Sequence, residues 1–193
     1  VARRTLEYMR DRITEGRTWN EVIEESEAFI RRKGGKPAFP STIAVNEMAA
    51  HYTTDHASRP PKEWERDMVF ERGDLVKLDV GVQINGCIGD NAMTIEVGGI
   101  RKHAEQIKIS EAARDAAVEA MLPGTPWHEV GAAAGQVVTD AGFNPIRNLC
   151  GHQLTKNELH AGVSVPSFEC GENHDGFKGN VPDEGFFAIE PFN

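Results

Sequence analysis

The chain has 193 residues, of which 39% are hydrophobic and 26% are charged, as in an ordinary soluble globular protein. Its formal net charge of −9 argues against a protein that mainly binds nucleic acid or an anionic membrane, since both need a basic surface, and no apolar run approaches the roughly 20 residues that span a bilayer. Three cysteines without CxxC spacing fit a reducing compartment better than a disulfide framework or a zinc site, so we expect a cytoplasmic domain.

Two helices are expected near the N-terminus. Apolar residues recur at helical spacing over positions 6–13, and Gly16 is predicted to end this first helix. Thr18 and Glu21 have the spacing of a capping box. The helix that they begin is predicted to run to Gly34.

The rest of the chain alternates β-type and helical segments. Residues 55–73 are polar and contain two consecutive prolines, which predicts an exposed excursion. Two β-type runs follow at 75–84 and 87–97, joined by Asn-Gly. A long helix is expected over 102–122 and a second over 125–142, with a proline near its start. The remainder is expected to form strands and loops.

A faint internal repeat accompanies these elements. Six identities recur at one constant offset within a short window, and the predicted helix starts and ends coincide as well. They pair Gly16, Trp19, Glu21, Val22, Gly34 and Pro37 with Gly124, Trp127, Glu129, Val130, Gly142 and Pro145. The pattern indicates two related halves, between which a cleft would be natural.

The most informative stretch is the hairpin at 75–97. Asn-Gly favours a two-residue type I′ turn, which fixes the pairing of the two strands on either side of it. Asp79 then faces Ala92 and Asp90 faces Gly81, so both aspartates lie on one face of the hairpin as diagonal neighbours. Close carboxylates on a partly buried face call for a proton or a cation, and divalent ions are one interpretation. The alternative is that each aspartate caps local backbone beside a solvated turn.

His152 and Glu190 are the other acceptors of interest. His152 follows an apolar strand-like stretch, and Glu190 lies in FFAIEPF, on the face alternate to its apolar neighbours. A single histidine or a single strand glutamate is more often structural. With the two aspartates they form a donor set that suits Mn, Fe, Co or Zn.

Taken together, four stretches resemble the methionine aminopeptidases of the pita-bread metallopeptidase family M24, over essentially the whole chain. The stretches are GGKPAFPSTIAVNEMAAHYT, GDLVKLDVGVQINGCIGDNAMTIEV, NLCGHQLTKNELHAGVSVP and EGFFAIEPF. The context AAHYT and the eight-residue step from His152 to His160 are similar to the type II enzymes.

The resemblance implies an α+β pita-bread fold, with two pseudo-symmetric halves and a curved antiparallel sheet flanked by helices. It also implies two divalent metal ions (Co, Mn, Fe or Zn), with Asp79 as a chelating ligand of one ion and Asp90 bridging both. His152 and Glu190 would bind the other ion, and Glu190 would also take a proton from the attacking water.

Further residues gain roles only from this resemblance. His51 and His160 would be catalytic histidines that are not ligands. The wall of the substrate pocket would contain Phe39, Leu159 and Phe192. The implied activity is removal of the initiator methionine from nascent proteins, by a cytoplasmic monomer in transient contact with the ribosome and without a specific nucleic acid or membrane partner.

The chain departs from the family pattern in three places. A fifth ligand, a second bridging glutamate on a later strand, is absent, as is the type II helical insert, so residues 1–193 are interpreted as a single incomplete catalytic domain. The stretch from His51 to Asp79 is longer than is usual in the family, which predicts a longer surface loop within 55–73. Gln153-Leu154 replaces the small residues usual after the ligand histidine.

Two alternatives remain from the sequence. Another pita-bread metallopeptidase, such as a prolidase or aminopeptidase P, shares the ligand set but differs around the histidines. A non-catalytic partner-binding protein on the same scaffold would have lost its ligands, whereas four are retained here. If the natural chain ends at residue 193, and so lacks the fifth ligand, the binding alternative gains considerably.

Overall fold

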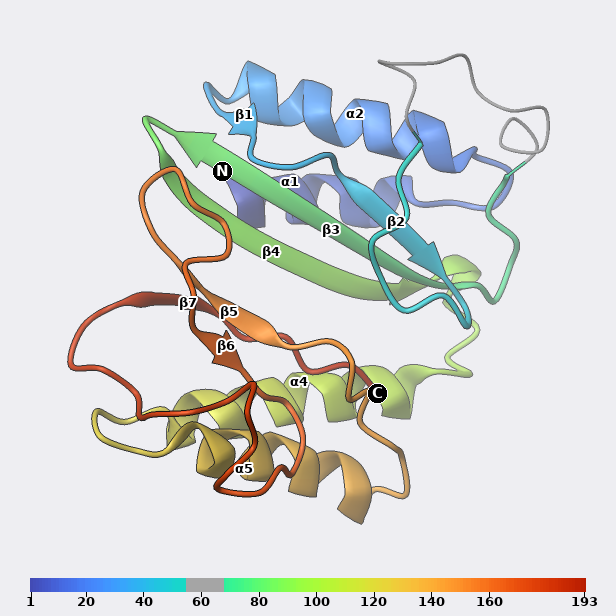
Figure 1. Cartoon of the computed structure of the whole chain (residues 1–193). Helices are drawn as coiled ribbons and strands as arrows, with labels where there is room; N and C mark the ends of the chain where they lie inside the picture. The colour runs from blue at the N-terminus through green and yellow to red at the C-terminus, as the bar shows by residue number, and fades with distance from the viewer. Residues whose placement is uncertain (55–67) are drawn as a thin grey trace. The chain divides into compact units, whose positions relative to one another are not determined.

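The computed structural model of the chain describes residues 1–54 and 68–193 and consists of two units, Val1–His103 and Ala104–Asn193. Each unit contains two main helices and an antiparallel sheet, so the predicted α+β class is confirmed (Figure 1). Within the described residues, no helix combines the length and apolarity needed to cross a membrane.

The first unit begins with two helices and continues into a four-stranded sheet. Its helices are α1, Ala2–Met9, and α2, Trp19–Arg32, with a 3₁₀ turn over Arg10–Arg12 after α1. The long strands β3, Leu75–Ile84, and β4, Cys87–Glu96, pair along their whole length. The short strands β1, Lys36–Pro37, and β2, Thr42–Val45, both pair with the other edge of β3.

Both helices of this unit cover the same face of its sheet, as Figure 1 shows in blue against green. The even-numbered residues of β3 from 76 to 82 point into this layer and are buried. Of these strand residues, Val76, Leu78 and Val80 form the core together with apolar side chains of α1 and α2, including Met9, Val22 and Ile30. The odd-numbered residues of β3 therefore point to the opposite face.

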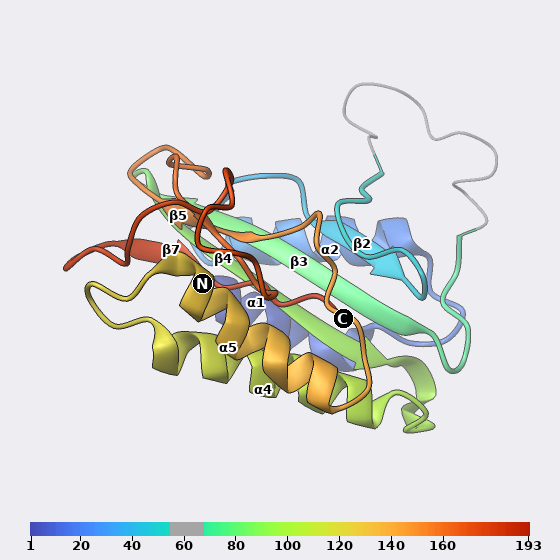
Figure 2. The ribbon, with the colours of Figure 1, turned by 60° about the horizontal axis from the view of Figure 1, so that its bottom comes forward.

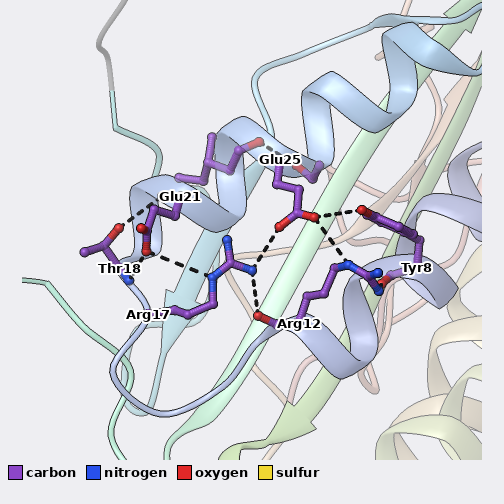
Figure 3. Close-up of polar contacts among 8 residues, drawn as sticks. Tyr8, Arg12, Arg17, Thr18, Glu21 and Glu25 are labelled. Atoms are coloured by element: carbon purple, nitrogen blue, oxygen red, sulfur yellow. Dashed lines mark hydrogen bonds and ion pairs between the residues drawn. The ribbon is translucent and has the colours of Figure 1, made fainter.

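A polar cluster joins α1 to α2 (Figure 3). Glu25 accepts hydrogen bonds from the Tyr8 hydroxyl at 2.8 Å and from Arg17 Nη1 at 2.9 Å, and Arg12 Nε lies 3.3 Å from the same carboxylate. Burial raises the pKa of Glu25, but these hydrogen bonds and cations outweigh it and hold the pKa below its ordinary value. The predicted capping box between Thr18 and Glu21 is present at the start of α2.

The second unit contains the helices α4, Ala104–Ala120, and α5, Trp127–Asp140, which run side by side (Figure 2). Its three-stranded sheet has the order β6-β5-β7, with β5 at Gly151–Leu154, β6 at Ser164–Val165 and β7 at Phe186–Ala188. Its core is built around Trp127, Val130, Val138, Val165 and Phe168.

The two units repeat the same local structure. The sequence repeat maps the first and last residues of α2 onto the first and last residues of α5. It also maps Thr18 onto Pro126, and each of these two residues forms an isolated β-bridge. The glycines flanking the helices share left-handed backbone, with φ of 83° and 85° at Gly16 and Gly124 and 81° at both Gly34 and Gly142. These equivalent bounds and dihedral angles confirm the predicted repeat of two related halves at the level of local structure.

Two expectations need correction. The first helix ends at Met9 and continues only as a 3₁₀ turn, so Gly16 lies in a later turn and does not end it. Residues 55–67 of the predicted excursion lie outside the described residues. Its end at 68–73 is not exposed throughout, because Phe70 is 1% exposed and stacks on Trp19. Burying an aromatic ring of this size in the core stabilises the fold more than leaving it exposed in a polar loop.

Candidate metal centre

The hairpin of β3 and β4 places Asp79 and Asp90 as predicted from the Asn-Gly turn. Asp79 is paired with Ala92 and Asp90 with Gly81, so both carboxylates extend from the face of the sheet that lies opposite the helices. Both aspartates are half-buried. Two carboxylates at diagonal positions on a partly desolvated face repel each other, and a multivalent cation would remove that repulsion.

Lys77 adds a positive group to the same face, two positions before Asp79. Its Nζ donates a hydrogen bond to the Asn46 carbonyl at 2.8 Å, so the ammonium is directed to the turn after β2. Burial lowers the pKa of Lys77 to about 8, although the negative charge of Glu47 opposes this shift.

His51 lies in the loop after β2 and is exposed. Its backbone has φ of 68°, a left-handed conformation that is uncommon for a residue other than glycine. The chain directly after it is fixed, since Ile43 N donates to the Tyr52 carbonyl at 2.8 Å and Thr53 Oγ1 to the Ser41 carbonyl at 2.9 Å. The imidazole is thus presented to solvent from a restrained loop.

Phe39 lies against β3 at Gly81, in the segment between β1 and β2. A Cβ built on Gly81 would stand 2.2 Å from Phe39 Cε1, so the ring occupies the volume that a side chain at this position would need. The predicted pocket residue Phe39 is therefore on the same face of the sheet as Asp79 and Asp90.

In the second unit, β5 and β7 bring His152 and Glu190 together. His152 lies on the central strand β5 opposite Ala188 of β7, and Glu190 follows two residues beyond the end of β7. His152 Nε2 is 3.1 Å from Glu190 Oε1, and the imidazole is buried, with 9% of its side chain exposed. The expected strand over FFAIEPF is shorter than predicted, because it ends at Ala188 and Glu190 lies in the irregular segment after it.

A tight turn after β5 returns the chain so that His160 contacts His152. Thr155 N and Glu158 O form a 3.0 Å hydrogen bond across the turn, and Asn157 takes the left-handed conformation that it requires. The imidazole rings of His152 and His160 are 4.3 Å apart in an edge-to-face arrangement.

The two pocket residues predicted for this unit, Leu159 and Phe192, are both half-buried. Leu159 lies in the tight turn next to His160. Phe192 lies two residues after Glu190, and its carbonyl accepts a 2.9 Å hydrogen bond from Ile146 N.

Sequence reasoning missed two residues that support Glu190. Ser167 is 2% exposed and donates a hydrogen bond from Oγ to the Glu190 carbonyl at 3.0 Å. Gly151 lets β5 approach β7 closely, because a Cβ there would stand 2.2 Å from the Ala188 carbonyl oxygen. A glycine inside a strand next to a candidate ligand was a usable signal for Gly151, whereas nothing in the sequence marked Ser167.

The donors in each unit have the chemistry of a transition-metal site. An imidazole nitrogen 3.1 Å from a carboxylate oxygen places two groups that can ligate a metal in one small volume, which suits a divalent cation. The paired carboxylates of the hairpin are acceptors of the kind that Mn, Fe, Co and Zn also use. The residues of both units therefore fit the metal ions that the sequence predicted.

Comparison with known proteins places these residues in a family context. A model of metallopeptidase family M24 matches residues 1–192. A methionine aminopeptidase from Pyrococcus horikoshii is 39% identical over 173 residues, which cover 89% of this chain and 54% of that protein. The chain thus spans about half the length of this curated relative.

Solved structures share the architecture. A methionine aminopeptidase from Thermotoga maritima matches with a TM-score of 0.81 and 27% identity, covering 97% of this chain and 73% of that one. The prolidase from Pyrococcus horikoshii matches with a TM-score of 0.72 and 26% identity, covering 97% and 50%. The fold is the pita-bread fold of these aminopeptidases.

Proposed function

The chain belongs to metallopeptidase family M24, and we propose that the protein is a type II methionine aminopeptidase that removes the N-terminal methionine of nascent proteins. The observation that carries the proposal is the convergence of His152 Nε2 and Glu190 Oε1 at 3.1 Å beside His160, in a chain whose hairpin holds the paired carboxylates of Asp79 and Asp90. Similarity to the curated methionine aminopeptidases supports this choice over a prolidase.

The proposed ligands are Asp79, Asp90, His152 and Glu190, and the proposed cofactor is a pair of divalent ions. When bound, such ions supply Lewis acidity that polarises a carbonyl and lowers the pKa of a water molecule towards neutrality. Mn, Fe, Co and Zn all suit this mixture of carboxylates and imidazole.

The chain's own groups would divide the remaining work. Glu190 would accept the proton of the attacking water at its carboxylate. His160, whose ring is held against His152, would donate a hydrogen bond to the oxygen on which negative charge develops. His51, held in its restrained loop, would help to protonate the leaving amine.

Three predicted residues would surround the side chain of the N-terminal residue. An aromatic ring such as Phe39 or Phe192 favours an unbranched thioether through contact with sulfur. Leu159 would complete the apolar lining beside His160. We propose that the protein acts as a cytoplasmic monomer in transient contact with the ribosome, which co-sedimentation of the protein with ribosomes would test.

The decisive experiment measures hydrolysis of Met-Ala-Ser by the protein at its native length, after Mn²⁺ or Co²⁺ is added to the apo form. We expect Asp90→Ala and His152→Ala each to lower kcat/KM by more than about 100-fold, because even residues behind metal ligands commonly cost 10- to 100-fold. Asp175→Ala is the matched control, since Asp175 is exposed and forms a surface ion pair with Lys178.

The alternatives predict different outcomes of the same experiment. Faster hydrolysis of a Xaa-Pro dipeptide than of Met-Ala-Ser would indicate a prolidase-type enzyme. Folded, metal-loaded protein that cleaves neither substrate would contradict the proposal and favour a partner-binding protein on this scaffold.

A further inference from the structure

Glycine at position 81 is required by a neighbouring side chain and not by its own backbone. Gly81 lies within β3 and is absent from the glycines with left-handed φ among the described residues, so its conformation is open to any residue. A Cβ on Gly81 would nevertheless stand 2.2, 2.3 and 2.9 Å from three ring atoms of Phe39. Real Cβ atoms essentially never come within 3.0 Å of such neighbours, so any side chain here must displace the ring.

The path of the chain explains how the ring reaches this place. Pro37 pairs with Val82, and Thr42 pairs with Asp79. The chain therefore advances five residues from Pro37 to Thr42 while β3 covers only three residues between their partners. The two extra residues form a bulge between β1 and β2, which carries Phe39. Just before the bulge the segment is still fixed to β3, since Ala38 N donates to the Gly81 carbonyl at 2.9 Å. Bulges commonly redirect a side chain in this way.

The ring lies beside the two proposed metal ligands of the hairpin. Gly81 is the register partner of Asp90 across β3 and β4, and Asp79 is the next residue of β3 on the same face. The ring therefore provides an apolar surface at the edge of the carboxylate pair. That is where the side chain of a substrate would lie if its reacting carbonyl were held near those carboxylates.

We infer that Gly81 is a specificity-determining residue for N-terminal side chains that are long, apolar and unbranched. By lacking a side chain, it lets Phe39 lie flat against β3 and leaves depth in front of the ring for a chain such as that of methionine. This inference rests on the proposed function. A methyl group at position 81 would push the ring away from the strand, into the space of the substrate side chain.

The expected effect is selective. One methylene of misfit in an apolar pocket typically changes kcat/KM by about 10- to 200-fold. Gly81→Ala should lower kcat/KM for Met-Ala-Ser within that range, whereas Ala-Ala-Ser, whose first side chain does not reach the ring, should change less than about threefold. Mn²⁺ affinity, measured by calorimetry, should stay within about twofold, because the carboxylates keep their register.

A matched control and a double variant isolate the contact. Gly89→Ala lies in β4 of the same hairpin, and its Cβ would meet no atom closer than 3.8 Å, so its selectivity should remain that of the wild type. In Gly81→Ala combined with Phe39→Ala the added methyl no longer meets a ring. The double variant should therefore have the selectivity of Phe39→Ala alone, even if Gly81→Ala by itself does not fold.

The outcomes separate this inference from the proposed function. An active wild type whose preference for methionine over alanine is unchanged by Gly81→Ala would overturn the inference alone. Additive effects of the two substitutions would also overturn it, because they would show that residues 81 and 39 act independently. A wild type that cleaves no methionyl peptide would overturn the proposed function first.

Discussion

Replacing Ser167 by alanine should weaken metal binding although Ser167 carries no proposed ligand. Its buried hydroxyl donates a 3.0 Å hydrogen bond to the carbonyl of Glu190, the residue whose carboxylate lies 3.1 Å from His152. Glu190 is outside β7, so the strand pairing that ends at Ala188 does not hold its peptide. The Ser167 hydroxyl donates a hydrogen bond that fixes this peptide directly.

The size of the effect follows from two contributions. Losing a hydrogen bond to a carbonyl that stays partly buried costs about 1–3 kcal/mol of folding free energy. Freeing one residue's backbone returns about 1–2 kcal/mol of conformational entropy, which binding must then remove again. Since about 1.4 kcal/mol is a factor of ten, Ser167→Ala should raise the Kd for Mn²⁺ by about 10-fold, at the low end of the range for residues that orient metal ligands.

Calorimetric titration of the apo protein with Mn²⁺, together with its thermal unfolding, measures both contributions. Ser26→Ala is the matched control, because Ser26 is also fully buried and its hydroxyl donates to a backbone carbonyl, that of Ile23, at 2.8 Å. Both variants should unfold at lower temperature, but only Ser167→Ala should lose metal affinity. Equal metal affinity of the two variants would refute the reasoning and leave Ser167 a purely structural residue.

Three further predictions concern stability. Because the pKa of Glu25 is lowered in the folded protein, its contribution to the free energy of unfolding is present above the ordinary pKa of 4.5 and is lost as the pH falls through the lower folded pKa. Glu25→Gln should therefore reduce the loss of stability at acid pH, measured by denaturant titrations at several pH values. An unchanged dependence of stability on pH would contradict this prediction. Gly151→Ala should cost about 1–3 kcal/mol by forcing β5 from the Ala188 carbonyl. Gly171→Ala is the control: nothing lies within 4 Å of its Cβ, so it should lower the free energy of unfolding much less. Equal urea midpoints for the Gly151→Ala and Gly171→Ala variants would refute the contact between position 151 and Ala188. Thr18→Ala should cost about 1 kcal/mol by removing the capping box of α2, which a urea midpoint equal to the wild type would disprove.

Local signals in the sequence were sufficient for the hairpin and for the helix starts. The Asn-Gly turn determines the register of β3 and β4, because a two-residue turn leaves one pairing, in which Val76, Leu78 and Val80 face the helices. The capping box at Thr18 likewise determines where α2 begins. In both cases the interacting residues are close in sequence.

Contacts between distant residues were not predictable in the same way. Ala188 pairs with His152 although the two are far apart in the chain, and no periodicity specifies which strand β5 selects. The contact of Phe39 with Gly81 depends on a bulge between β1 and β2. This bulge becomes apparent only when the β1–β3 register is compared with the β2–β3 register. Phe70 was predicted to be exposed because its neighbours are polar, whereas a single aromatic ring was enough to draw that segment into the core.

The hairpin also sets the order in which the proposed ligands emerge during synthesis. Asp79 and Asp90 can come together as soon as Glu96 is made, since hairpins close in about 1–10 μs. His152 and Glu190 are added later, after roughly 3–12 s and roughly 5–20 s, because chains grow at about 5–20 residues per second. Carboxylates alone suit hard ions such as Mg²⁺. A growing chain would thus present an all-oxygen pair of carboxylates, suited to hard cations such as Mg²⁺, for several seconds before the imidazole of His152 is made.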